Sequence, residues 1–125
     1  MRLITIYLIL CTALSLHAKE SEVKIDREAI RRVFRSGLIE FKKCYEAEYS
    51  KNKSLAGKVV LFLEITDEAA VKSAKIKSTT LKNENVENCL IEKVKTFVFP
   101  AASKGTVAEV LYPIVFQPNE IKTNY

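Results

Sequence analysis

Cys44 and Cys89 are the two cysteines outside the first eighteen residues, and cysteine is a residue type that can do chemistry beyond packing. Cys44 lies near the end of an amphipathic run, and Cys89 lies in the later segment VENCLIEKV. A cysteine can act as a nucleophile, as a metal ligand or as half of a disulfide, and each role requires different neighbours. The choice among these roles therefore depends on which other residue types are present.

The first eighteen residues have the layout of a secretory signal peptide. Arg2 supplies a positive charge, an apolar run extends over residues 3–16, and Ala18 precedes the charged sequence KESE. The run is shorter than the roughly 20 apolar residues that span a bilayer. We therefore expect residues 1–18 to be removed on export to the periplasm or the medium, leaving 19–125. Without cleavage, the same segment would tether the protein to the inner membrane at its amino terminus.

Histidine is absent from the expected mature chain, because His17 lies in the leader. Acid–base catalysis near neutral pH and most zinc, copper and iron sites use histidine. The acidic residues fall among lysines at helical spacing, which is typical of solvated helix faces. The sequence thus predicts no enzyme activity, no cofactor and no metal site.

Cys44 and Cys89 are then most simply paired with each other. Exported proteins enter an oxidising compartment, where two cysteines normally form a disulfide. This bond would close a loop of about 46 residues, which in the chain-entropy model stabilises the fold by roughly 4 kcal/mol. The cysteines are therefore predicted to have a structural role.

Composition indicates one small domain. The net charge is +5, but lysine and arginine are mixed with glutamate along the chain, so a nucleic-acid partner is not expected. No motif for a small-molecule substrate is present. Three glycines and three prolines are too few for an internal linker, and no repeat occurs. Residues 19–125 are therefore predicted to fold as a single domain.

The first half of this domain shows a helix followed by two strands. Apolar residues recur with a period of 3.6 after Asp26, a good N-cap, which predicts a helix to about Tyr49 with a bend at Gly37. The segment GKVVLFLEIT is apolar on both faces and therefore predicts a central strand. VKSAKIKSTTL carries lysines on one face, which suits an edge strand that resists aggregation.

The second half shows one helix and one strand. The helix is expected to begin near Asn83 or Asn85, with Phe97 still on its apolar face, and to end before Pro100. TVAEVLYPIVFQP predicts a third strand, and Pro113 places it at an edge or at a bulge. The predicted fold is α+β, in the order α-β-β-α-β. Its three-stranded antiparallel or mixed sheet has the order 2-1-3, with both helices on one face.

Five segments form a recognisable set: IRRVFRSGLIEFKKCYE, LAGKVVLFLEI, VKSAKIKSTTLKNENVENCL, FVFP and LYPIVFQP. Together they resemble the carboxy-terminal domain of TonB-related proteins, most closely that of the AgmX/PglI gliding-motility proteins. The resemblance covers residues 30–118, with both cysteines in register with the Leu-x-Gly-Lys, Phe-Pro and Tyr-Pro-x-x-Phe motifs. The hairpin segment TDEAAVKSA lacks the usual glycine, and Val98 lies where the family tends to have an aromatic residue.

The resemblance implies a non-enzymatic module of the bacterial cell envelope that binds another protein. Better-known members of the family carry a membrane anchor and a long linker, and only a short segment separates Ala18 from Asp26, so energy transduction is not expected. A small secreted inhibitor or surface binder of the cystatin-like type is the alternative. A second helix between strands two and three argues against that layout.

The predicted partner site is the edge of the third strand. This strand contains a single charged residue, so an extended partner segment is expected to add to its free edge. TonB-like domains are known for this mode of binding. Pro113 lacks a donor, which limits pairing to the preceding residues, and a proline at Val110 is expected to weaken binding. The candidate partner-binding residues are Val107, Glu109, Val110, Leu111 and Tyr112.

Overall fold

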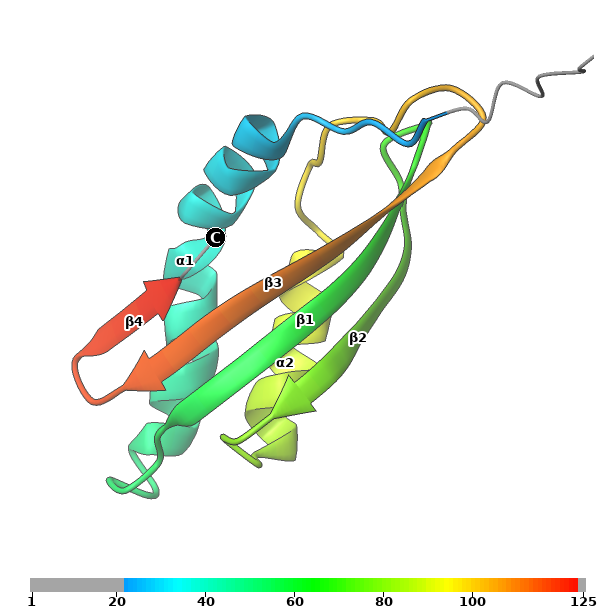
Figure 1. Cartoon of the computed structure of the whole chain (residues 1–125). Helices are drawn as coiled ribbons and strands as arrows, with labels where there is room; N and C mark the ends of the chain where they lie inside the picture. The colour runs from blue at the N-terminus through cyan, green and yellow to red at the C-terminus, as the bar shows by residue number, and fades with distance from the viewer. Residues whose placement is uncertain (1–21, 124–125) are drawn as a thin grey trace, which may run out of the picture.

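The structure is a computed structural model that describes residues 22–123, in which two helices cover one face of a four-stranded sheet (Figure 1). The elements, in chain order, are α1 (Arg27–Tyr49), β1 (Gly57–Thr66), β2 (Val71–Thr79), α2 (Glu84–Val94), β3 (Val107–Gln117) and β4 (Glu120–Thr123). The expected signal peptide lies outside the described residues.

Helix α1 begins at the predicted cap and presents its apolar stripe to the sheet. The Asp26 carboxylate accepts a hydrogen bond from the Ala29 amide at 3.0 Å, which satisfies one of the free donors of the first turn. The helix runs through Gly37 as one element. Its glycine serves a close approach instead, because a Cβ at Gly37 would overlap the ring of Phe97. Gly37 therefore allows the ring of Phe97 to pack closely on α1.

The sheet is antiparallel throughout and has the order β2-β1-β3-β4. The predicted order 2-1-3 and the central position of β1 are therefore confirmed. One face of β1 is fully buried against the helices, through Val59, Leu61, Leu63 and Ile65. The opposite face of β1, with Val60 and Phe62, is only partly covered. The domain thus has two layers and one open sheet face.

Strand β4 is the element that the sequence analysis missed. Within the described residues it pairs with β3 from Ile114 to Gln117, and it is joined to β3 by Pro118 and Asn119. Asn119 has φ +68°, and a proline followed by such a residue is typical of a type II turn. The third strand is consequently an edge strand over only part of its length.

Aromatic side chains join α1 to β3 through the core. The rings of Phe34 and Tyr112 stack at a centroid distance of 3.6 Å, and Phe34 also contacts Phe97 and Phe99. Helix α2 ends at Val94, so the predicted helix was too long at its carboxyl end. Phe97 still packs on α1 from the turn that follows. This cluster fixes α1 across the sheet, with its first turns facing β3.

Candidate functional site

The disulfide joins the two helices at the middle of their interface. Cys44 on α1 and Cys89 on α2 are bonded, with their Cα atoms 5.7 Å apart, and Cys44 is buried. Such bonds persist in oxidising environments, so the pairing is typical of a protein outside the cytoplasm. No group of three or more His, Cys, Asp or Glu residues that could hold a metal occurs within residues 22–123.

Polar contacts flank the disulfide one helical turn away on each side. Lys93 of α2 lies 3.4 Å from the Glu40 carboxylate, which also accepts a hydrogen bond from Lys43 at 3.0 Å. Lys43, followed by Lys93, holds the pKa of Glu40 below its usual value. On the other side, hydrogen bonding from Lys51 is the main cause of a lowered pKa for Glu48, and Asn85 of α2 contributes. The α1–α2 interface is therefore closed by covalent and polar contacts.

The edge of β3 differs because, within residues 22–123, positions 107–113 pair with β1 alone. The ladder between β1 and β3 runs without interruption through Pro113, which stands opposite Val60. Proline has no N–H, so the nitrogen of Pro113 must face away from β1. Backbone direction alternates along a strand, so Val107, Glu109 and Leu111 also direct their N–H and C=O groups to the outer edge. β4 begins to cover this edge only at Ile114.

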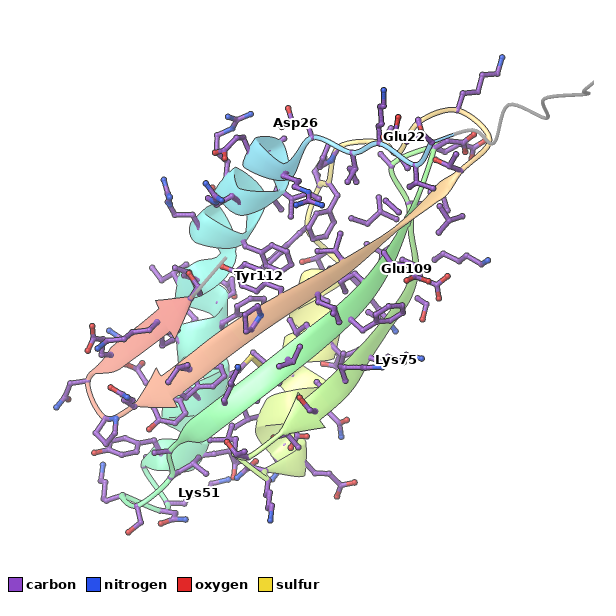
Figure 2. The ribbon with its side chains drawn as sticks, in the orientation of Figure 1. Glu22, Asp26, Lys51, Lys75, Glu109 and Tyr112 are labelled. Carbon is purple, nitrogen blue, oxygen red and sulfur yellow. A yellow bond between two sulfur atoms is a disulfide. The ribbon has the colours of Figure 1, made fainter. Side chains whose placement is uncertain are left out.

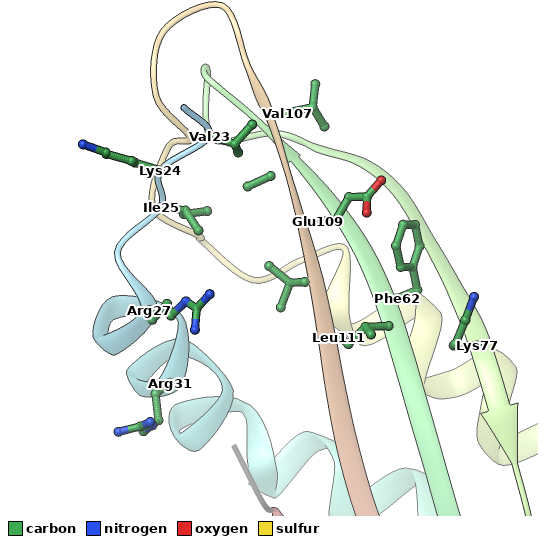
Figure 3. A pocket seen from close by; sticks show the side chains of 12 residues that line it. Val23, Lys24, Ile25, Arg27, Arg31, Phe62, Lys77, Val107, Glu109 and Leu111 are labelled. Carbon is green, nitrogen blue, oxygen red and sulfur yellow. The ribbon is translucent and has the colours of Figure 1, made fainter. Parts of the chain in front are cut away.

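An open groove of about 1160 Å³ runs along this free edge (Figure 3). Its lining residues are Val23, Lys24, Ile25, Arg27, Arg31, Phe62, Lys77, Val107, Ala108, Glu109, Val110 and Leu111. One wall is the segment before α1, which is held to the loop before β3 by the Ser103 amide donating to the Lys24 carbonyl at 2.8 Å. The groove therefore reaches from α1, around the edge of β3, to the open sheet face.

The charges around the groove are mainly positive. Lys24, Arg27, Arg31 and Lys77 line it, against the single carboxylate of Glu109. Arg31 pairs with Glu28 at 2.7 Å and Lys24 with Glu22 at 3.3 Å, both near the surface. Arg27 and Lys77 form no ion pair within the described part of the chain. The side chains that line the groove thus carry a net positive charge, which favours an anionic ligand.

The five predicted partner-binding residues divide into two groups in the structure. Val107, Glu109 and Leu111 direct their backbone groups outward, and the Leu111 side chain is 49% exposed. Val110 and Tyr112 are buried, and their backbone groups face β1. Glu109 and Tyr112 accordingly point to opposite faces of the sheet (Figure 2). The proposed proline at Val110 is therefore the wrong test, since it would break the β1–β3 ladder.

The wall of the groove opposite β3, formed by Arg27 and Arg31, was also not predicted from the sequence. Arg27 and Arg31 lie four residues apart on α1 and so share one helix face, which is a readable signal of a basic stripe. Nothing in the sequence indicates that this stripe faces β3, far along the chain.

Across residues 22–123, no helix is both long enough and apolar enough to cross a membrane.

Fold and groove together define a class of protein: a two-layer α+β domain, closed by a disulfide between its helices, with a partly open sheet edge beside a basic groove. Comparison of the chain with family models, with curated proteins and with solved structures found no match. The resemblance to TonB-related domains therefore remains an expectation from the sequence.

Proposed function

We propose that this chain is a non-enzymatic protein-interaction module of the bacterial cell envelope, in the periplasm or secreted. It binds an extended segment of a partner protein by strand addition to residues 107–113 of β3. The observation that carries this proposal is the free edge itself, where outward backbone groups lie beside an open groove. Extended segments add to such edges through main-chain hydrogen bonds, and neighbouring pockets then select side chains.

The opposite edge of the sheet is a poorer docking site. β2 carries exposed lysines at positions 72, 75 and 77, and its pairing with β1 shifts register twice. Charged side chains and bulges are the features by which natural sheets prevent edge pairing. The free part of β3 carries only Glu109 as a charged residue, so the two edges differ in the direction that favours β3.

Location outside the cytoplasm is supported by two independent features. The leader-like segment 1–18 predicts export, and the helix-joining disulfide is suited to an oxidising compartment. The envelope machinery that the partner belongs to, whether TonB-like or related to gliding motility, rests on the sequence resemblance. The cystatin-like alternative gains no support, because α2 lies between β2 and β3.

The test is a crosslinking capture from the native envelope with matched variants of Leu111. Leu111→Pro removes an outward N–H while leaving the β1 ladder intact, because Leu111 has the same backbone direction as Pro113. Leu111→Val keeps both the donor and an apolar side chain. Purified wild-type protein and each variant are crosslinked to envelope extract, and captured proteins are identified by mass spectrometry.

We expect the wild type and Leu111→Val to capture the same partner, and Leu111→Pro to capture at least about tenfold less of it. The reason is that the loss of one hydrogen bond, with strain on its neighbours, weakens binding by about 1.5 kcal/mol. Circular dichroism must show that both variants are folded. Equal capture by folded Leu111→Pro would place recognition on another surface, such as the exposed helix faces.

A further inference from the structure

We propose that the segment that adds to β3 is acidic, with carboxylate side chains directed toward α1 and apolar side chains directed toward the open sheet face. This inference rests on the proposed function and assigns the chemistry of the ligand. Its basis is the difference between the two sides of the free edge, one walled by arginines and the other by Leu111 and Phe62, with Lys77 further away on β2, two strands from β3.

Strand β4 shows where the side chains of an added strand would point. β4 pairs with the second half of β3, and an added strand along 107–113 would continue in line with it. Ile121, a half-buried residue of β4, faces α1 in a small cleft with Lys42 and Tyr45. Alternate residues of an added strand would face α1 in the same way, but nearer its amino terminus.

The part of α1 that these residues would meet is basic. Arg27 and Arg31 lie across the groove from β3, and Lys24 precedes them (Figure 3). Ile25 supplies an apolar part of the same wall. Arg27 forms no ion pair within residues 22–123, and its guanidinium can bind a carboxylate through two hydrogen bonds, while Arg31, which pairs with Glu28, adds positive charge beside it. A glutamate or aspartate of the added strand that points toward α1 therefore fits this wall, and a lysine at the same position does not.

The other side of the edge disfavours acidic residues. Glu109 stands directly opposite Glu64 in the β1–β3 register, and both belong to the open face of the sheet. A third carboxylate there would be repelled, because like charges on neighbouring strands destabilise a sheet. Leu111 is opposite Phe62 on the same face, and together they offer an apolar contact. The two sides thus specify an alternation of acidic and apolar residues.

The experiment lengthens the chain itself, which makes the added strand intramolecular and raises its effective concentration. Six residues, Val-Glu-Val-Glu-Val-Thr, are appended after Tyr125 of the exported chain. A strand continuing in the register of β4 places the second and fourth added residues opposite Val110 and Ala108, on the α1 side. Two matched extensions carry glutamine or lysine at these two positions.

The measurement is amide hydrogen exchange at Glu109 and Leu111 by NMR. We expect the glutamate extension to slow exchange about fivefold more than the glutamine extension, and the lysine extension to slow it least. The double variant Arg27→Gln and Arg31→Gln should remove the advantage of glutamate. A control with the same loss of charge, Arg32→Gln and Lys95→Gln, alters exposed residues outside the groove and should retain it.

The outcomes separate this inference from the proposed function. Equal protection by all three extensions would leave strand addition standing and overturn the acidic preference. A glutamate advantage that survives in the Arg27 and Arg31 double variant would overturn the assignment to these arginines. Protection of neither amide by any extension would contradict strand addition itself.

Discussion

At the α1–α2 interface, Glu40, Cys44 and Glu48 of α1 each meet a partner on α2, whereas residues 107–113 of β3 pair with a strand on one side only. The interface contains the Cys44–Cys89 disulfide, and the carboxylates of Glu40 and Glu48 have hydrogen-bonding partners there. The edge directs backbone donors and acceptors into an open groove.

Unpaired strand edges normally invite aggregation, so natural sheets protect them. Here β2 is protected by lysines and β3 is covered by β4 only from Ile114 onward. Residues 107–113 of β3 have neither form of protection within the described part of the chain, and the proposed function assigns this edge to a partner. The rigid interface holds α1, and therefore the basic wall of the groove, in a fixed position relative to that edge.

The largest expected effect comes from breaking the covalent part of the interface. Replacing Cys44 and Cys89 together by alanine should lower the free energy of unfolding by about 4 kcal/mol, because the unfolded chain regains the entropy of the closed loop. Urea unfolding followed by circular dichroism measures the change. The reduced wild type should resemble the double variant, and equal midpoints for the oxidised wild type and the double variant would contradict the stabilising role.

Gly37 tests the packing of the same interface region. Gly37→Ala should destabilise the fold by about 1–3 kcal/mol, because the added methyl group meets the ring of Phe97. Alanine is normally the better residue in a helix interior, so a stabilising effect would refute this contact. Adding Phe97→Leu to Gly37→Ala should recover part of the loss, as a thermal-unfolding double-mutant cycle can show.

Within β3, the half that pairs with β4 should differ in amide exchange from the half that does not, and weakening the β3–β4 turn should reduce this difference. Asn119→Ala should cost about 1 kcal/mol, since alanine disfavours the positive φ of this turn. The Val115 and Gln117 amides, which face β4, should then exchange faster and approach the rates of Glu109 and Leu111. Asn119→Gly, which tolerates the same φ, is the control and should keep both amides protected in an NMR exchange experiment.

Acid should weaken the polar part of the interface by a smaller amount. The folded-state pKa values of Glu40 and Glu48 lie below the ordinary value of 4.5. Their stabilisation is therefore complete at pH values above 4.5 and is lost as the pH falls through the lower folded values. Urea midpoints of the wild type and of Glu40→Gln with Glu48→Gln should differ at pH 7 and converge at acid pH.

A control pair, Glu68→Gln with Glu92→Gln, changes carboxylates that form no ion pair in the described part of the chain. Its difference from the wild type should vary less with pH. A gap between the wild type and the Glu40 and Glu48 variant that stays constant down to pH 3 would contradict the role of these two carboxylates.

Local signals in the sequence were sufficient for most of the fold. The Asp26 cap and the apolar period that follows it define α1, and the two-sided apolar pattern of β1 places it at the centre of the sheet. β4 was missed because it has four residues, too few for a visible alternation. Its one local signal was the Pro118–Asn119 pair, which is typical of a turn.

The groove could be predicted only in part, because it depends on contacts between distant segments. The free edge followed from the pattern of β3, but the direction of each N–H group required the register with β1. Pro113 gives this direction only once the ladder is known to run through it without a bulge, because a proline nitrogen must then face away from β1. Arg27 and Arg31 lie beside the groove because Phe34 of α1 packs on Tyr112 of β3. The periodicity of the sequence does not predict this contact.

Hydrogen exchange along β3, with and without the captured partner, tests the central claim most directly. In the free protein the Glu109 and Leu111 amides should exchange rapidly, while those of Val115 and Gln117 are protected by β4. Partner binding should protect Glu109 and Leu111 and leave Val115 and Gln117 unchanged. Unchanged exchange at Glu109 and Leu111 in a saturated complex, with new protection on the helices, would contradict strand addition at β3.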